Sequence, residues 1–149
     1  MKVAIASDHG GFELKQNIRE ILAELDIEYE DLGPLSCESV DYPDFALPVA
    51  ERVASGEFTR GILVCGTGIG MSIAANKVPG IRAALCHDTF SARATREHND
   101  SNILALGERV VGKGLAGEIV KIWLTTEFAG GRHQKRVEKI TQIEGKYLR

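Results

Sequence analysis

The sequence has few aromatic residues and no long hydrophobic run. Aromatic residues make up 6% of its 149 residues and hydrophobic residues 44%, so aliphatic side chains must fill the interior, as is typical of helices packed on a buried sheet. No apolar run approaches the roughly 18 residues that a membrane-spanning helix needs. The N-terminus, MKVAIASDHGG, lacks the pattern of a signal peptide. We therefore expect neither secretion nor a membrane partner.

Cysteine is also scarce. The three cysteines, Cys37, Cys65 and Cys86, are odd in number and lie far apart. None belongs to a CxxC pair, the spacing that is typical of zinc and redox sites. We interpret them as reduced thiols and expect a cytoplasmic protein.

Positive charge is sparse over most of the chain. The sequence has 18 Lys and Arg residues against 21 Asp and Glu, a net charge of −3. Within residues 131–149, however, six basic residues accompany two glutamates. Because duplex binding needs a broad cationic surface, this distribution argues against a nucleic-acid partner. A small anion held by a few arginines fits the sequence better.

Short apolar runs alternate with segments of helical periodicity along the chain. The expected strands are residues 2–6, 28–32, 61–65, 83–86 and 103–106. The expected helices are residues 11–25, a segment within 44–54, a segment ending near 76, then 88–98, 115–125 and about 132–143. Such alternation favours right-handed crossovers and a parallel sheet covered on both faces. We predict a single α/β domain over residues 1–149, a three-layer α/β/α sandwich around a five-stranded parallel Rossmann-like sheet.

Ligands of such sheets bind beyond the carboxyl ends of the strands, so the residues after each strand are the candidate site. One of them is a glycine loop, Gly66-Thr67-Gly68-Ile69-Gly70, between the strand GILVC and a helix. Backbone N–H groups and a helix start would converge there and bind phosphate, carboxylate or an enolate oxygen. The loop matches neither the Walker pattern nor the dinucleotide pattern GxGxxG. The alternative is that its glycines permit only a tight turn.

Three further candidates adjoin strand ends. Cys65 ends its strand beside the glycine loop, a position that can make a thiolate a base or nucleophile. A buried cysteine is otherwise an inert small hydrophobe. Asp8 and His9 follow the first strand and would point into the cleft. Asp8 could also be a helix N-cap, and the two roles do not exclude each other.

His98 and Asn99 precede the fifth strand and are therefore expected at the opposite end of the sheet. In a monomer they form a helix C-terminus, where His98 suits the helix dipole and Asn99 acts as a cap. A catalytic His98 would have to serve the cleft of a second subunit. Arg132 and Arg136 lie four residues apart on one helix face after Gly130-Gly131. They form either a phosphate clamp or part of a solvated basic face.

Five sequence blocks between residues 5 and 140 carry a further signal. They are SDHGGFELK, ESVDYPDFA, CGTGIGMSIAANKVPGIRAAL, REHNDSNILALGERVVG and FxGGRHxxRVxKI. Together they resemble the family of ribose-5-phosphate isomerase B, which also contains galactose-6-phosphate and allose-6-phosphate isomerases. The resemblance implies interconversion of an aldose phosphate and a ketose phosphate through ring opening and a cis-enediolate, without a metal or another cofactor.

The resemblance also implies roles for single residues. Cys65 matches the cysteine that moves the proton between C1 and C2, His98 matches the residue that protonates the ring oxygen, and Thr67 is the third expected catalytic residue. The amides of Gly66, Thr67, Gly68, Ile69 and Gly70 match those that hold the enediolate oxygen. The other expected substrate-binding residues are Asp8, His9 and Asn99 for the sugar, and Arg109, Arg132 and Arg136 for the phosphate.

In the family, His98, Asn99 and Arg109 match residues of the adjacent subunit. The resemblance therefore implies a homodimer with shared active sites, or a tetramer of such dimers, that binds a small-molecule sugar phosphate. His87 and His133 match no family role, and we interpret them as surface residues. An isomerase of galactose 6-phosphate or allose 6-phosphate is one alternative. The other is a non-catalytic α/β domain that binds a nucleotide through residues 66–70 and Asp88.

Overall fold

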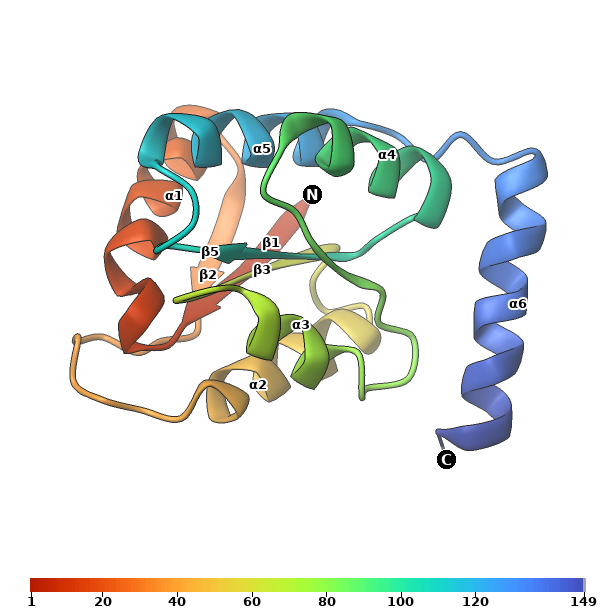
Figure 1. The fold of residues 1–149 in the computed structure, drawn as a ribbon, viewed down its shortest axis with the longest axis horizontal. Helices are drawn as coiled ribbons and strands as arrows, with labels where there is room; N and C mark the ends of the chain where they lie inside the picture. The colour runs from red at the N-terminus through yellow and green to blue at the C-terminus, as the bar shows by residue number, and fades with distance from the viewer. Residues whose placement is uncertain (149) are drawn as a thin grey trace.

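Five parallel strands form one sheet in the computed structural model, which describes residues 1–148 (Figure 1). The strands are β1 (Lys2–Ser7), β2 (Glu28–Asp31), β3 (Arg60–Cys65), β4 (Ala83–Leu85) and β5 (Ile103–Gly107). Their order across the sheet is β2-β1-β3-β5-β4, and every neighbouring pair is parallel. The prediction of a five-stranded parallel sheet is confirmed.

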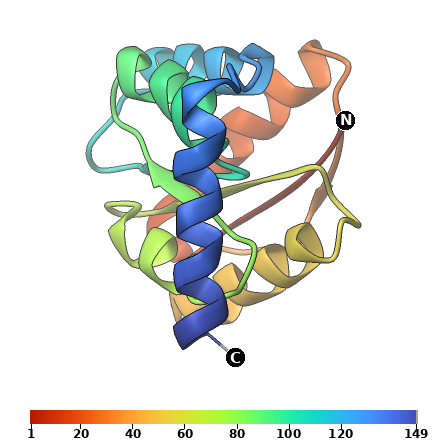
Figure 2. The ribbon, with the colours of Figure 1, turned by 90° about the vertical axis from the view of Figure 1, so that its right-hand side faces the viewer.

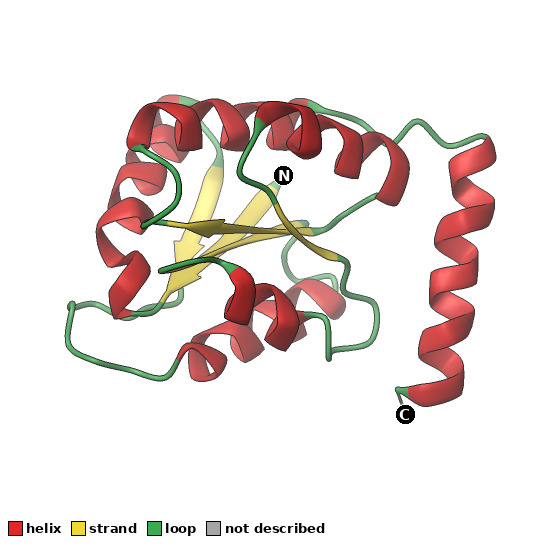
Figure 3. Cartoon of the chain, viewed as in Figure 1, coloured by secondary structure: helices red, strands yellow, loops and turns green. Residues whose placement is uncertain are grey.

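Helices cover both faces of this sheet, as predicted (Figure 3). They are α1 (Phe12–Glu24), α2 (Tyr42–Ala54), α3 (Ile69–Ala75), α4 (Thr89–Asn99), α5 (Lys113–Thr125) and α6 (Arg132–Tyr147). One face packs against α1, α4 and α5, and the other packs against α2 and α3. These layers confirm the α/β/α sandwich. The predicted domain runs to Arg149, which lies outside the described residues.

Most helix boundaries differ from the predicted ones by one or two residues, and the end of α6 differs by four. Helix α2 begins at Tyr42 rather than within 44–54, because Pro43 occupies its first turn, where a missing N–H leaves no hydrogen bond unmade. Helix α6 continues past residue 143 to Tyr147. Its last turns are attached to the body by Glu144, whose carboxylate accepts from the Gly80 amide at 3.2 Å.

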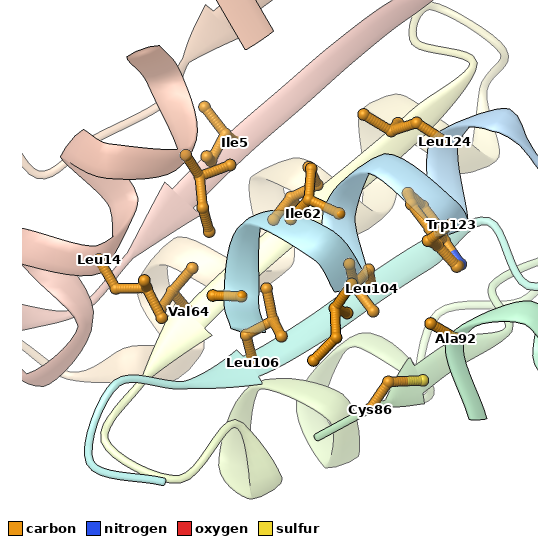
Figure 4. Close-up of a cluster of buried hydrophobic side chains, with 14 of the residues drawn as sticks. Ile5, Leu14, Ile62, Val64, Cys86, Ala92, Leu104, Leu106, Trp123 and Leu124 are labelled. Carbon is orange, nitrogen blue, oxygen red and sulfur yellow. The ribbon is translucent and has the colours of Figure 1, made fainter. Parts of the chain in front are cut away.

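The core makes the sheet a rigid platform for the loops at its edges. Between the sheet and the α1, α4 and α5 layer, Ile5, Ile62, Leu104 and Trp123 are fully buried (Figure 4). Each aliphatic side chain of this kind stabilises the fold by about 1.5 to 3 kcal/mol through the surface it removes from water. The Trp123 indole N–H also donates to Ser101 Oγ at 2.9 Å, so its polar atom is satisfied inside the core.

The strand order reverses next to β1. Strand β1 pairs with β2 on one side and with β3 on the other, so the connections that follow β1 and β3 leave in opposite directions. The carboxyl ends of these two strands are the topological switch point, where open α/β sheets bind ligands. The residues just beyond them are Asp8 and Gly66.

A buried ion pair holds the loop that follows β2. The fully buried Lys15 ammonium donates to Asp31 Oδ1 at 2.9 Å and to the Pro34 carbonyl at 2.6 Å. Burial lowers the pKa of Lys15, and the hydrogen bond to Asp31 opposes that shift. Further along, the Val40 amide donates to the His9 ring. The segment between β2 and α2 is thereby attached to the switch point.

Helix α6 lies apart from the layers, beyond the amino ends of the strands (Figures 1 and 2). In Figure 2 it crosses the end of the molecule from one helical layer to the other. None of the helices within residues 1–148 has the length and hydropathy needed to cross a membrane.

Candidate active site

The loops after β1 and β3 lie directly against each other. The Asp8 amide donates to the Val64 carbonyl at 3.1 Å. A Cβ on Gly11 would lie 2.5 Å from the carbonyl carbon and oxygen of Val64, so the close approach of the two loops requires glycine there. Asp8 Oδ1 accepts from the Gly11 amide at 3.1 Å, which confirms the N-cap interpretation. The cap holds Asp8 and His9 beside the end of β3.

The His9 ring is oriented by the backbone. The Val40 amide donates to His9 Nδ1 at 3.2 Å, so the neutral ring carries its proton on Nε2. That nitrogen is left as a donor that suits a hydroxyl or phosphate oxygen.

The glycine loop needs its glycines for close packing. Gly68 has a left-handed backbone with φ of +74°, and a Cβ there would lie 2.6 Å from Leu85 Cδ1 and 2.8 Å from the Leu106 carbonyl carbon. A Cβ on Gly107 would lie 2.6 Å from the Thr67 carbonyl carbon. The tight-turn interpretation is therefore correct for the backbone. The same turn leads into α3, whose first amides have no acceptor within the helix and can donate to an anionic oxygen.

Cys65 lies under this loop at the end of β3. Its side chain is 5% exposed, and its Sγ accepts a hydrogen bond from the Gly68 amide at 3.0 Å. A donated hydrogen bond and an adjoining helix start both stabilise negative charge on sulfur. By contrast, burial and the nearby Asp88 raise the pKa of Cys86 to about 11, and Cys37 is exposed in a loop. Of the three thiols, Cys65 therefore has the environment of a reactive group.

Arg109 lies beside the glycine loop of its own chain. Its amide donates to the Gly66 carbonyl at 3.0 Å, and a Cβ on Gly66 would lie 3.1 Å from its guanidinium Nη1. Within one chain Arg109 therefore lies with Cys65, whereas the resemblance implied that it comes from an adjacent subunit. The reason is the pairing of β3 with β5, which sets Cys65 opposite Gly107. The residues that follow these two strands, Gly66 and Arg109 among them, therefore lie side by side.

Sequence reasoning assigned no role to Tyr42 or Glu108 at this end of the sheet, and it misjudged His87. The Tyr42 ring packs over Gly70, where a Cβ would lie 2.7 Å from its Cζ. The Glu108 carboxylate accepts from the Leu14 amide at 2.5 Å, which fixes the start of α1. His87 is not a plain surface residue, because it is half-buried and its Nε2 accepts from the Gly107 amide at 3.2 Å. Tyr42 lies in the block ESVDYPDFA, the signal that could have identified it.

A second group of expected residues gathers where α4 ends and α6 begins. The rings of His98 and His133 stack with their centroids 4.3 Å apart and their planes 15° from parallel. Partial burial lowers the pKa of His133, and the positive charges of His98, Arg132 and Arg136 lower it further. His133 is therefore a member of this group. Its interpretation as a surface residue without a role in the site is corrected.

Two guanidinium groups fix the backbone beside His98. Arg82 Nε lies 3.0 Å from the carbonyls of both Asn99 and Asp100. Arg96 Nη1 donates to the Asp100 carboxylate at 2.9 Å. Asp100, with a left-handed φ of 48°, is the C-cap of α4, so Asn99 is the last helical residue and not the predicted cap.

The two groups lie at opposite ends of the sheet (Figure 1). The first group follows the carboxyl ends of strands and consists of Asp8, His9, Cys65, Arg109 and the glycine loop. The second group lies by the amino ends and consists of His98, Asn99, Arg132 and Arg136. One chain does not bring all the predicted residues into one cleft. A groove of about 520 Å³ separates α6 from the body, and it is lined by Asn99 but by none of the first group. Residues 1–148 contain no cluster of three or more His, Cys, Asp or Glu side chains that could hold a metal ion.

Comparison with known proteins adds to this geometry. The model of a family described as ribose/galactose isomerase matches residues 3–140. The chain is 54% identical over 143 residues to ribose-5-phosphate isomerase B of Escherichia coli (strain K12), covering 96% of each chain. The structure of ribose-5-phosphate isomerase B from Clostridium thermocellum superposes with a TM-score of 0.97, 62% identity and 99% coverage of both chains. That from Mycoplasma genitalium with bound ribulose-5-phosphate gives 0.93 and 42% identity, covering 97% of this chain and 96% of that one.

Proposed function

The chain belongs to the ribose/galactose isomerase family, and from that membership we propose that it interconverts ribose 5-phosphate and ribulose 5-phosphate. Moving a carbon-bound proton needs a base, and the enediolate needs hydrogen-bond donors for its oxygen. The observation that carries this chemistry is the Cys65 sulfur, which lies beneath the glycine loop with the Gly68 amide 3.0 Å away. The loop offers both the base and the donors.

The proposed active unit is a homodimer with two shared sites. One subunit supplies Cys65, the glycine loop, Asp8, His9 and Arg109. The other supplies His98, Asn99, Arg132 and Arg136. In one chain these two groups lie at opposite ends of the sheet, and this placement supports the arrangement. Helix α6 also exposes apolar side chains, with Ile143 61% and Tyr147 69% exposed, which a second copy would cover. A tetramer of such dimers would leave each shared site unchanged.

Ring opening is the first proposed step. The sugar phosphate enters as a furanose whose ring oxygen is bonded to C1. His98 donates a proton to that ring oxygen while the C1 hydroxyl gives its own proton to water. The bond between C1 and the ring oxygen breaks, and C1 becomes an aldehyde. Asp8, His9 and Asn99 hold the sugar hydroxyls during this step.

Isomerisation follows at the Cys65 end of the site. The Cys65 thiolate removes the proton from C2, and the electron pair forms a C1–C2 double bond, so that negative charge develops on the C1 oxygen. The amides of residues 66–70, with Thr67 among them, stabilise that oxygen. Cys65 then returns the proton to C1, and the C2 hydroxyl proton moves to the C1 oxygen. The product is a ketone at C2.

Arginines hold the phosphate in the proposal. Arg132 and Arg136 lie on one face at the start of α6, next to the stacked His98. Arg109 reaches the same site from the subunit that contributes Cys65. Planar guanidinium groups suit phosphate because they donate two parallel hydrogen bonds.

The nucleotide-binding alternative is not favoured. Asp88, its expected ribose ligand, is the N-cap of α4 and accepts from the Ser91 amide at 2.6 Å and from the Ser91 hydroxyl at 2.8 Å. It also follows β4, at the edge of the sheet and away from the switch point. No observation favours the 6-phosphate sugars over ribose 5-phosphate.

The test is a side-by-side assay of ribose 5-phosphate, allose 6-phosphate and galactose 6-phosphate. We expect kcat/KM to be highest for ribose 5-phosphate. A higher value for either hexose phosphate would assign the chain to the other branch of its family, and no turnover of any of the three would refute the proposal. The proposal includes a cytoplasmic location, because a catalytic Cys65 needs a compartment that keeps thiols reduced.

A further inference from the structure

The imidazole of His98 stacks against another imidazole. Within residues 1–148 the His98 ring makes no hydrogen bond, and it is exposed at the end of α4. Its close ring contact is His133, stacked at 4.3 Å and 15°. We propose that His133 is a positioning residue, whose ring fixes the His98 ring in the orientation that proton donation to the sugar requires. The inference rests on the proposed function.

The chain between α5 and α6 builds this contact. The Ala129 amide donates to the Glu97 carbonyl at 3.1 Å, which attaches the connecting segment to the last turn of α4. Helix α6 then begins at Arg132, so His133 lies in its first turn, level with His98. The stack therefore joins the residue expected to protonate the sugar to the helix expected to bind its phosphate.

Charge and burial around His133 disfavour a proton on that ring. The charged groups facing His133 are Arg132 and Arg136 from its own helix, and His98 and Glu97 from α4. Partial burial and the three positive groups lower the pKa of His133, with Glu97 opposing them. A neutral His133 presents an uncharged aromatic face against which the His98 ring stacks.

Three variants separate stacking from other roles of His133. His133→Ala removes the ring, and His133→Phe keeps a flat ring that cannot titrate. Gln134→Ala is the matched control, because Gln134 is exposed on the same turn and its side chain bonds Glu138, away from the histidine pair. For ribose 5-phosphate we expect His133→Ala to lower kcat by about tenfold or more, since misplacing a catalytic group is costly. KM should stay within about twofold, and His133→Phe should restore most of kcat.

A second substrate separates positioning from a general loss of structure. An aldotetrose 4-phosphate cannot close a furanose ring, because its O4 carries the phosphate. Its turnover therefore needs no ring opening and should be the same in His133→Ala as in the parent.

Several outcomes would overturn the inference. The first is a His133→Ala variant that behaves like Gln134→Ala. The second is a His133→Phe variant as slow as His133→Ala, and the third is an equal loss of tetrose turnover in His133→Ala. A rise in KM for both substrates with kcat unchanged would make His133 a phosphate ligand instead. If the parent protein itself does not turn over ribose 5-phosphate, the proposed function fails, and that result is distinct from all of these.

Discussion

The amide of Gly68 donates a hydrogen bond to the sulfur of Cys65 across 3.0 Å. The left-handed backbone of Gly68, with φ of +74°, lets the chain fold back over the strand end. The residue that permits the turn thus also supplies the donor to the sulfur. The packing role and the chemical role of the glycine loop are therefore two results of one backbone conformation.

Replacing Cys65 by alanine should remove the base. We expect Cys65→Ala to lower kcat by at least about 10² with KM nearly unchanged, as for loss of a general base that contributes little to ground-state binding. The variant should also lose exchange of solvent deuterium into C2 of recovered substrate. Cys37→Ala, at an exposed loop position, is the control and should match the parent. Near-parental turnover by Cys65→Ala would refute the assignment.

Cys37 and Cys86 should differ in their reaction with an alkylating reagent. Burial raises the pKa of Cys86 to about 11, so at pH 8 this residue is a buried thiol with almost no thiolate. We expect iodoacetamide to modify the exposed Cys37 in the folded protein and to reach Cys86 only after unfolding. Peptide mass mapping of native and urea-unfolded samples measures both. Modification of Cys86 in the folded protein would contradict its burial.

Much of the site could be predicted from local sequence, for a physical reason. A buried parallel strand is a short apolar run, and the polar residues that follow it must lie at a sheet edge. This logic places Asp8 and Cys65 correctly. It also separates His98 from them, because residues that precede a strand lie at the other end.

Contacts that depend on strand order could not be predicted in this way. Arg109 lies beside Gly66 because β5 pairs with β3, although β4 intervenes in sequence, and no local pattern specifies that order. The stack of His133 on His98 depends on the path of the irregular segment between α5 and α6. The ring of Tyr42 over Gly70 likewise arises from the packing of α2 beside α3.

Mixing inactive variants should test which residues share a group. In a mixed dimer of Cys65→Ala and His98→Asn, one of the two sites contains both native residues. Because half of randomly mixed dimers are mixed and each has one intact site, about a quarter of parental activity should return. No recovery after verified subunit exchange would count against shared sites.

The same experiment tests the placement of the arginines. The structure places Arg109 with Cys65 and Arg136 with His98. Arg109→Ala should therefore restore activity when mixed with His98→Asn but not with Cys65→Ala, and Arg136→Ala should do the reverse. The opposite pattern would return Arg109 to the adjacent subunit.

Alanine at Gly68 should harm both fold and activity. A left-handed backbone costs a residue with a Cβ about 1 to 2 kcal/mol, and that atom would also lie 2.8 Å from the Leu106 carbonyl carbon. We expect a lower free energy of unfolding in urea and a lower kcat. Gly145→Ala is the control, since nothing lies within 4 Å of a Cβ there, and it should stabilise α6 by up to about 1 kcal/mol. A Gly68→Ala protein as stable and active as the parent would rule out the proposed close packing.

The start of α6 offers a matched pair of cationic side chains. Arg136 lies four residues after Arg132, on the same helix face, whereas Lys135 is turned about 100° from Arg136 around the helix axis. If the guanidinium groups hold the phosphate, Arg136→Ala should weaken substrate binding by on the order of 2 to 5 kcal/mol. KM should then rise strongly, and kcat should also fall if phosphate binding positions the sugar.

Lys135→Ala removes the same charge from the same turn and should change little. Inorganic phosphate should compete with substrate in the parent and in Lys135→Ala, but much less in Arg136→Ala. Equal behaviour of the two variants would mean that this helix presents only a solvated basic face, and the phosphate site would then have to lie at the glycine loop.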